Sequence, residues 1–177
     1  MQMTYDIFAH RHKFAVWAAS RAVQRGWKGA RISCLREAIE GCCVNEFIKD
    51  SASFSTTSEQ FESLHRRWCR LIQDQLTRRG IEASYGRVAK LLAVYLKVMI
   101  VIAGSEKTLL AQAIHPPIDR QLLQTLAKVK HISRLRYISY TELGSEEYYD
   151  LVSDLRQLLE HGQPFWMLEE HWPVTDD

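Results

Sequence analysis

The sequence has few of the features that mark secreted, disulfide-rich or metal-binding proteins. Its four cysteines (Cys34, Cys42, Cys43 and Cys69) include no CxxC pair, and none is spaced from a histidine as zinc ligands are. Their apolar surroundings are typical of reduced, buried thiols. The first residues lack the basic region and apolar stretch of a secretory signal. We therefore expect a cytoplasmic protein with no metal site and no cofactor.

Domain linkers, internal repeats and sustained alternating strand patterns are also absent from the sequence. The 177 residues are 46% hydrophobic and 25% charged, which is typical of one globular domain with its own core. The most apolar stretch, residues 88–103, contains Lys90 and Lys97, so it predicts a core helix and not a membrane span. The predicted fold is all-α: one compact domain, residues 1–177, built as a bundle of about six helices with a short aromatic C-terminal tail.

Apolar periodicity and capping residues place the six predicted helices. Ser33 is a candidate N-cap for the second helix. Thr57 with Gln60 forms a capping box for the third, and Ser84 can cap the fourth. The predicted helices cover residues 8–25, 33–48, 57–79, 86–103, 118–130 and 145–160, with a loop at residues 50–57 and a tail at residues 164–172 that docks on the body. The predicted core includes Trp17, Trp68, Leu91, Leu92, Val94 or Tyr95, Val98 and Ile102.

Charge is distributed unevenly along the chain. Residues 1–140 contain 22 lysines and arginines against 11 acidic residues, and residues 141–177 contain one arginine against ten. The two parts carry +11 and −9, which sum to the net charge of +2. A basic body favours a polyanionic partner, DNA in our interpretation, and we expect no membrane partner. Alternatively, the acidic segment folds back and neutralises the body, or it binds a protein partner.

Lys90 and Asp119 are the candidate catalytic residues. Lys90 lies on an apolar helix, where partial burial would favour the nucleophilic amine. Asp119 follows Pro117 at a helix start, where free backbone N–H groups keep a carboxylate ionised. Such a pair suits a reaction that develops cationic character. The alternative is structural: a lysine on a solvated stripe and an ordinary capping aspartate.

The two segments together resemble the helix-hairpin-helix DNA glycosylases, in particular the archaeal-type 8-oxoguanine branch. Val88-Ala89-Lys90-Leu91-Leu92 is similar to the lysine helix of that family, and Pro117-Ile118-Asp119 is similar to its Pro-x-Asp element. The resemblance covers about residues 84–130. It implies that Lys90 is the imine-forming nucleophile and that Asp119 stabilises the sugar cation and assists proton transfer.

A glycosylase must also bind DNA and hold an extruded base. The predicted base pocket is formed by His115, Trp27 and Trp166. The cations predicted to contact the DNA backbone form one continuous positive surface that the acidic tail leaves uncovered: Arg87, Lys97, Arg120, Lys128 and Lys130. The stretch His10–Lys13 could also contact phosphates, or could be a polar helix start.

Two other functions fit parts of the sequence. A non-catalytic helical subunit would bind DNA or an acidic partner through the basic body and would need no Lys–Asp pair. Arg156 and His161 fit the Arg-x4-His pattern of HEPN-type ribonucleases. About two such matches are expected by chance in this composition, and the pattern lies in an acidic segment that would repel RNA. The base-excision function is therefore our leading hypothesis.

Overall fold

The computed structural model describes residues 5–172, and all regular structure within that range is helical. The all-α prediction is confirmed. Within these residues, eight α-helices replace the six that were predicted, and four further segments are 3-10 or π-helical. In chain order the elements are α1 (Ile7–Val23), α2 (Ile32–Gly41), α3 (Val44–Lys49), η1 (Ser51–Ser55), α4 (Ser58–Thr77), α5 (Tyr85–Leu96), η2 (Lys97–Ser105), α6 (Leu109–Ala113), α7 (Arg120–Val129), η3 (Ser133–Tyr137), α8 (Ser145–Arg156) and η4 (Phe165–His171).

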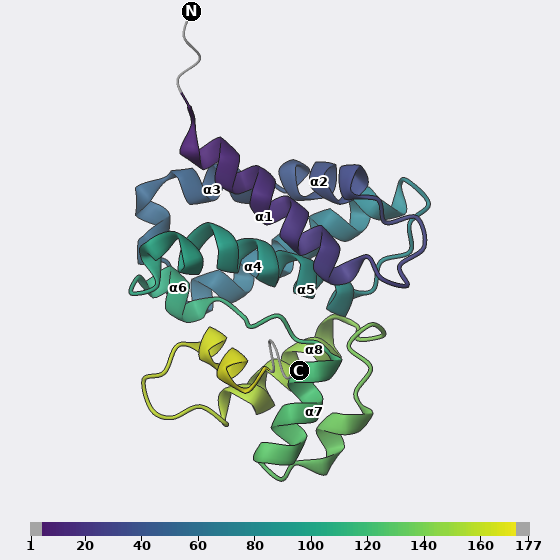
Figure 1. Cartoon of the computed structure of the whole chain (residues 1–177), viewed down its shortest axis with the longest axis vertical. Helices are drawn as coiled ribbons and strands as arrows, with labels where there is room; N and C mark the ends of the chain where they lie inside the picture. Colours follow the sequence, from purple (N-terminus) through teal and green to yellow (C-terminus); the bar gives the residue numbers. More distant parts are fainter. Residues whose placement is uncertain (1–4, 173–177) are drawn as a thin grey trace, which may run out of the picture.

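The helices form two parts along the long axis of the molecule (Figure 1). The larger part contains α1 to α6, with α1 and α2 packed over α5 and α4. The smaller part contains α7, α8 and η4. Helix α5 packs against α1, α4 and α8, so it connects the two parts.

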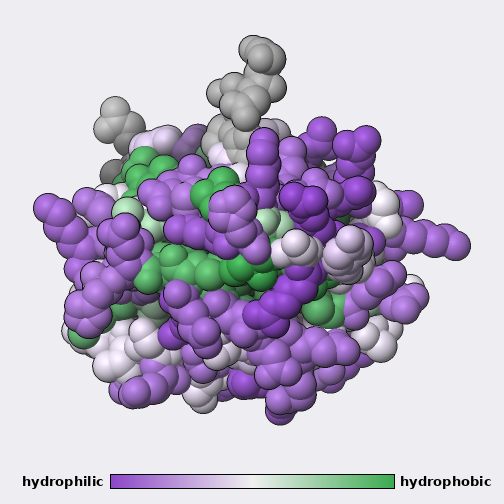
Figure 2. All heavy atoms as spheres, turned by 90° about the horizontal axis from the view of Figure 1, so that it is seen from below, coloured by the Kyte–Doolittle hydropathy of each residue, from purple (hydrophilic) through white to green (hydrophobic). Residues whose placement is uncertain are grey.

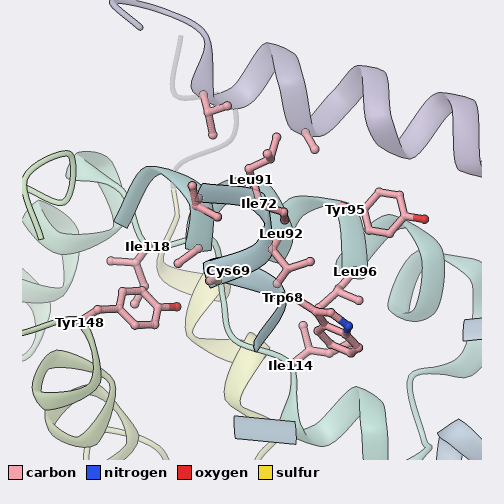
Figure 3. Close-up of a cluster of buried hydrophobic side chains, with 14 of the residues drawn as sticks. Trp68, Cys69, Ile72, Leu91, Leu92, Tyr95, Leu96, Ile114, Ile118 and Tyr148 are labelled. Carbon is pink, nitrogen blue, oxygen red and sulfur yellow. The ribbon is translucent and has the colours of Figure 1, made fainter. Parts of the chain in front are cut away.

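Helix α5 is the central helix, as predicted. Ten of its twelve residues are buried, and Leu91, Leu92 and Tyr95 are fully enclosed. They pack with Trp68 and other residues of α4 in the cluster drawn in Figure 3. The segment Tyr85–Ser105 also has the length and hydropathy of a membrane span, and 56% of its most apolar window is buried inside the body. Core packing accounts for that apolar character.

The prediction that Ile102 belongs to the core is wrong, because its exposed fraction is 66%. The chain changes from α-helical to the wider π-helical winding at Lys97, within η2. This change rotates the residues that follow out of the phase set by α5. Val98 comes directly after the change in winding and stays buried, whereas Ile102, four residues later, faces outward.

The prediction that Trp17 belongs to the core is also wrong, whereas Trp68 is buried as expected. Helix α1 faces α5 with a stripe of small residues, namely Ala15, Val16, Ala19 and Val23. Trp17 lies on the opposite side of α1 and is 51% exposed. The small stripe fits against α5 without a large side chain, so Trp17 is left outside.

Local capping signals located several helix starts correctly. The Thr57–Gln60 capping box is present, and the Ser84 side chain accepts a hydrogen bond from the Arg87 backbone. Ser33 is not a cap, because α2 already begins at Ile32. The predicted helix over residues 33–48 is broken where Cys43 adopts a left-handed backbone conformation, with φ at 61°.

We expect Leu92→Ala to lower the free energy of unfolding by roughly 2–5 kcal/mol, because it opens a cavity among enclosed side chains. Urea unfolding at pH 7 measures this. Ile102→Ala is the matched control, since the same kind of truncation at an exposed site should change stability by less than about 0.5 kcal/mol. Equal effects of the two variants would contradict the central placement of α5.

Candidate functional site

Lys90 of α5 and Asp119, which precedes α7, form a buried ion pair. The Lys90 Nζ donates to the Asp119 Oδ2 at 3.0 Å, and each side chain is only about 10% exposed. The other carboxylate oxygen of Asp119 accepts the Leu122 backbone N–H at 2.9 Å, as an N-cap does. The capping bond holds the carboxylate still, and the ion pair joins the central helix to the smaller part of the molecule.

The chain before α7 explains how Asp119 reaches Lys90. Helix α7 begins at Arg120, two residues later than predicted, because Pro116 and Pro117 stay outside the helix. Ile118 is 2% exposed and packs near Tyr148 in the core (Figure 3). With Ile118 anchored, the extended backbone of Asp119 directs its carboxylate towards α5.

Gly86 allows the segment 139–143 to lie directly on the first turn of α5. The Gly86 backbone N–H donates to the Leu143 carbonyl at 3.1 Å. A Cβ at this position would collide with the Tyr140 carbonyl oxygen. As a result the Tyr140 ring comes to lie 5.1 Å from the Lys90 Nζ, a cation–π distance. The Lys90 ammonium is therefore held between a carboxylate and an aromatic ring.

A surface pocket of about 340 Å³ lies close to the pair, although neither Lys90 nor Asp119 lines it. Arg120 and Tyr140 line it together with Arg136, Tyr137, Ile138, Ser139 and Thr141. Arg120 is the next residue after Asp119, and the Tyr140 ring covers Lys90. The pocket therefore combines two cations and two tyrosines next to the ion pair. Sequence reasoning missed Arg136, Tyr137 and Tyr140, because neither η3 nor the turn after it carries a pattern that marks a site.

Lys97 was predicted to be a free surface cation, but it forms a second ion pair. Its Nζ donates to the Glu169 Oε1 at 2.7 Å, and the Glu169 side chain is 10% exposed. Burial raises the pKa of Glu169, the Lys97 hydrogen bond and charge lower it, and the nearby Asp119 charge raises it again. The C-terminal element η4 is thus fastened to the same helix face that carries Lys90.

The other predicted DNA-binding cations have different surroundings. The Arg87 guanidinium lies 5.5 Å from the Trp27 ring and donates to the Gly26 carbonyl. Arg120, Lys128 and Lys130 are exposed, and within residues 5–172 none of them takes part in an ion pair.

Within residues 141–172, no acidic side chain forms an ion pair with these α7 cations. Glu146 lies against Arg66 and Asp154 against Arg134. The end of the molecule formed by α7 is mostly hydrophilic, with a band of hydrophobic residues across its middle (Figure 2). Among the described residues, Lys97 is the one cation of the five predicted to contact DNA that pairs with an acidic residue of the C-terminal tail.

The three predicted base-pocket residues are not brought together. His115 is 1% exposed and hydrogen-bonds the Tyr148 hydroxyl inside the core. Trp27 donates its indole N–H to the Glu82 carbonyl and lines a different pocket, of about 270 Å³. Trp166 belongs to η4 and is half-buried. The pocket near Lys90 is lined by none of these three residues. The predicted base pocket of His115, Trp27 and Trp166 is therefore not formed.

A buried cluster of histidines and tyrosines lies between α4, α5 and α8, and no sequence pattern predicted it. The His65 Nδ1 lies 2.8 Å from the Tyr149 hydroxyl, and the rings of His65 and His115 are 4.5 Å apart. Burial lowers the pKa of His65 to about 3, and the Arg66 charge adds to this. Burial also lowers the pKa of His115 well below its usual value. Both histidines are therefore neutral at pH 7.

Arg156 and His161 line one pocket of about 330 Å³. The Arg156 guanidinium lies against the Glu62 carboxylate at 3.1 Å and over the Phe165 ring. Glu160 also lines this pocket. Acidic groups thus surround the two residues of the Arg-x4-His pattern. Within the described residues there is no cluster of side chains able to hold a metal ion.

No protein-family model, no curated protein and no solved structure matches this chain. Any functional assignment consequently depends on the residues and the geometry described above.

Proposed function

We propose that the protein is a DNA N-glycosylase that removes a damaged or modified base with Lys90 as nucleophile and Asp119 as its carboxylate partner. The observation that carries this proposal is the 3.0 Å distance between the Lys90 Nζ and the Asp119 Oδ2. The two residues are 29 positions apart in sequence, and the fold holds them in contact at the junction of its two parts. Their resemblance to the lysine and aspartate of the helix-hairpin-helix glycosylases suggests the same division of tasks.

The chemistry requires the two groups to exchange a proton. Lys90 transfers a proton to Asp119, and its free electron pair then attacks the sugar C1′. The C1′–Nζ bond forms as the bond between C1′ and the base breaks, and the departing base keeps that electron pair and takes up the proton that Asp119 received. The new secondary ammonium then returns a proton to Asp119, its electron pair expels O4′ from C1′, and O4′ takes that proton, which leaves an imine between Nζ and C1′ of the opened sugar. Asp119, once ionised again, stabilises cationic character at the sugar. Because Lys90 and Asp119 are already in contact before the substrate binds, the proton transfer between them does not depend on a diffusional encounter.

The surroundings of the pair support a nucleotide as substrate. Tyr137 and Tyr140 offer aromatic faces to an extruded base, and Arg120 and Arg136 offer charge to the adjacent phosphates. Lys128 and Lys130, at the other end of α7, extend the positive charge along the duplex. The pocket volume of about 340 Å³ is within the range of small-molecule sites.

The test is base release from duplex oligonucleotides that carry 8-oxoguanine or uracil. We expect release by the wild-type protein, none by Lys90→Gln, and release slowed roughly 100-fold by Asp119→Asn. Lys107→Gln, which changes an exposed lysine, is the matched control and should retain full activity. Duplex affinity should be largely unchanged in Lys90→Gln, because other cations bind the backbone. Base release by Lys90→Gln at the wild-type rate would contradict the proposal.

A non-catalytic DNA-binding subunit is the second candidate, and one observation favours it. Both members of the ion pair are about 90% buried and have hydrogen-bond partners, as in a pair that only joins α5 to α7. Such a protein would bind DNA with a steep salt dependence and release no base from any duplex. The same assay therefore separates the two functions.

A further inference from the structure

The outer face of α1 carries an exposed row of aromatic and basic side chains. His10, Phe14, Trp17 and Arg21 follow one another at spacings of four, three and four residues, so they lie along one side of the helix. Phe14 and Trp17 are each about half exposed, and their rings are 5.8 Å apart. We call these four residues and Lys13 the α1 face. Two large aromatic side chains side by side in water are unusual on a helix whose other side is fully packed.

The charge on this face is basic except at its N-terminal end, where Asp6 caps the helix by accepting the Phe8 and Ala9 backbone N–H groups. Helix α1 contains no aspartate or glutamate, while Arg11, Lys13 and Arg21 are all basic. Of the acidic residues of the neighbouring α2, Glu40 contacts α1 at His12, which is not part of the α1 face, and Glu37 lies against Arg79. The α1 face therefore presents cations that flank exposed aromatic rings.

We propose that the α1 face binds single-stranded nucleic acid, with bases stacked on Phe14 and Trp17 and phosphates contacted by Lys13 and Arg21. Alternating stacking platforms and backbone-neutralising cations are what single strands require. A duplex hides its base faces, so it can use only the cations. An apolar protein partner would gain from the rings, and the surrounding positive charge would remain unmatched.

This surface is separate from the Lys90–Asp119 pair. The buried stripe of α1 packs on α5, so the exposed row points away from the core. In Figure 1, α1 lies across the larger part of the molecule, and α7 lies at the opposite end. A strand bound on α1 would therefore occupy a second site, independent of whether the pair is catalytic.

The test measures binding of a fluorescent oligo-dT 15-mer and of a matched 15-base-pair duplex by anisotropy, with the full chain. We expect the wild type to prefer the single strand. Phe14→Ala and Trp17→Ala should each weaken oligo-dT binding at least fivefold. Arg21→Ala should reduce the salt dependence of binding. Leu109→Ala and Arg70→Ala, at exposed positions on other helices, are the matched controls and should bind as the wild type does.

The substitutions on the α1 face and the two control substitutions are at exposed positions, so these variants should fold as the wild type does. Lys90→Gln should retain oligo-dT binding, so failure of the glycosylase proposal is distinguishable from failure of this one. Unchanged affinity in Trp17→Ala would overturn the inference, as would tighter binding of the duplex. It would also be overturned if the α1 face bound anionic lipid vesicles or a second copy of the chain and no oligonucleotide.

Discussion

Asp119→Ala should lower the free energy of unfolding by about 3–5 kcal/mol, because it leaves the Lys90 ammonium buried without its partner. Loss of the N-cap bond to Leu122 adds to the effect. Urea unfolding at pH 7 measures the change. Glu46→Ala is the contrasting variant, because the Glu46–Lys49 pair is exposed and pairs of that kind contribute roughly 0–1 kcal/mol.

The double variant Lys90→Met/Asp119→Asn shows whether the loss comes from the unpaired charge. Methionine removes the cation and keeps the apolar stem, and asparagine can still cap α7. Stability should then recover most of what Asp119→Ala loses, since no buried charge is left unmatched. A loss well below 1 kcal/mol in Asp119→Ala would mean that Lys90 reaches water and that the two groups are not held together.

Lowering the pH from 7 to 5 should destabilise the protein by roughly 2 kcal/mol for each of His65 and His115. Burial depresses the pKa of both histidines in the folded state, that of His65 to about 3. The unfolded chain takes up protons below about pH 6.5, and the folded chain does not. Stability conferred by the neutral forms is therefore full above the unfolded pKa and falls as the pH decreases towards the folded pKa.

Urea midpoints at pH 7, 6 and 5 measure this dependence. His65→Gln should reduce the slope by about half, because one of the two buried bases is gone. His161→Gln changes an exposed histidine and should leave the slope as it is in the wild type. A midpoint that does not change between pH 7 and 5 would show that the cluster of histidines and tyrosines is open to water.

The parts of the fold that could be predicted depend on neighbouring residues. Thr57 with Gln60, Ser84 and Asp119 each mark a helix start, because a cap and its backbone donors are two or three residues apart. The predicted helix over residues 33–48 ran through Gly41, although α2 ends at this glycine, two residues before the left-handed Cys43. Short α6 was overlooked, although Thr108 caps it in the usual way.

The site was predictable only where a resemblance supplied the pairing. Periodicity placed Lys90 on an apolar helix and Asp119 at a helix start, and the family resemblance suggested that they meet. The Lys97–Glu169 pair joins residues 72 positions apart, and no pattern in either segment indicates it. The Tyr140 ring reaches Lys90 because Gly86, which has no Cβ, lets the Tyr140 backbone pack directly against α5. The sequence gives no sign of this contact between two distant segments.

The most direct test of the central claim is borohydride trapping on duplex DNA that carries 8-oxoguanine or an abasic site. Borohydride reduces an imine between Lys90 and the opened sugar to a stable amine, and peptide mass spectrometry then locates the modified residue. We expect a covalent adduct on Lys90 in the wild type and in Lys107→Gln, and none in Lys90→Gln. No adduct in the wild type on any of these duplexes, or an adduct on a different lysine that persists in Lys90→Gln, would contradict the central claim.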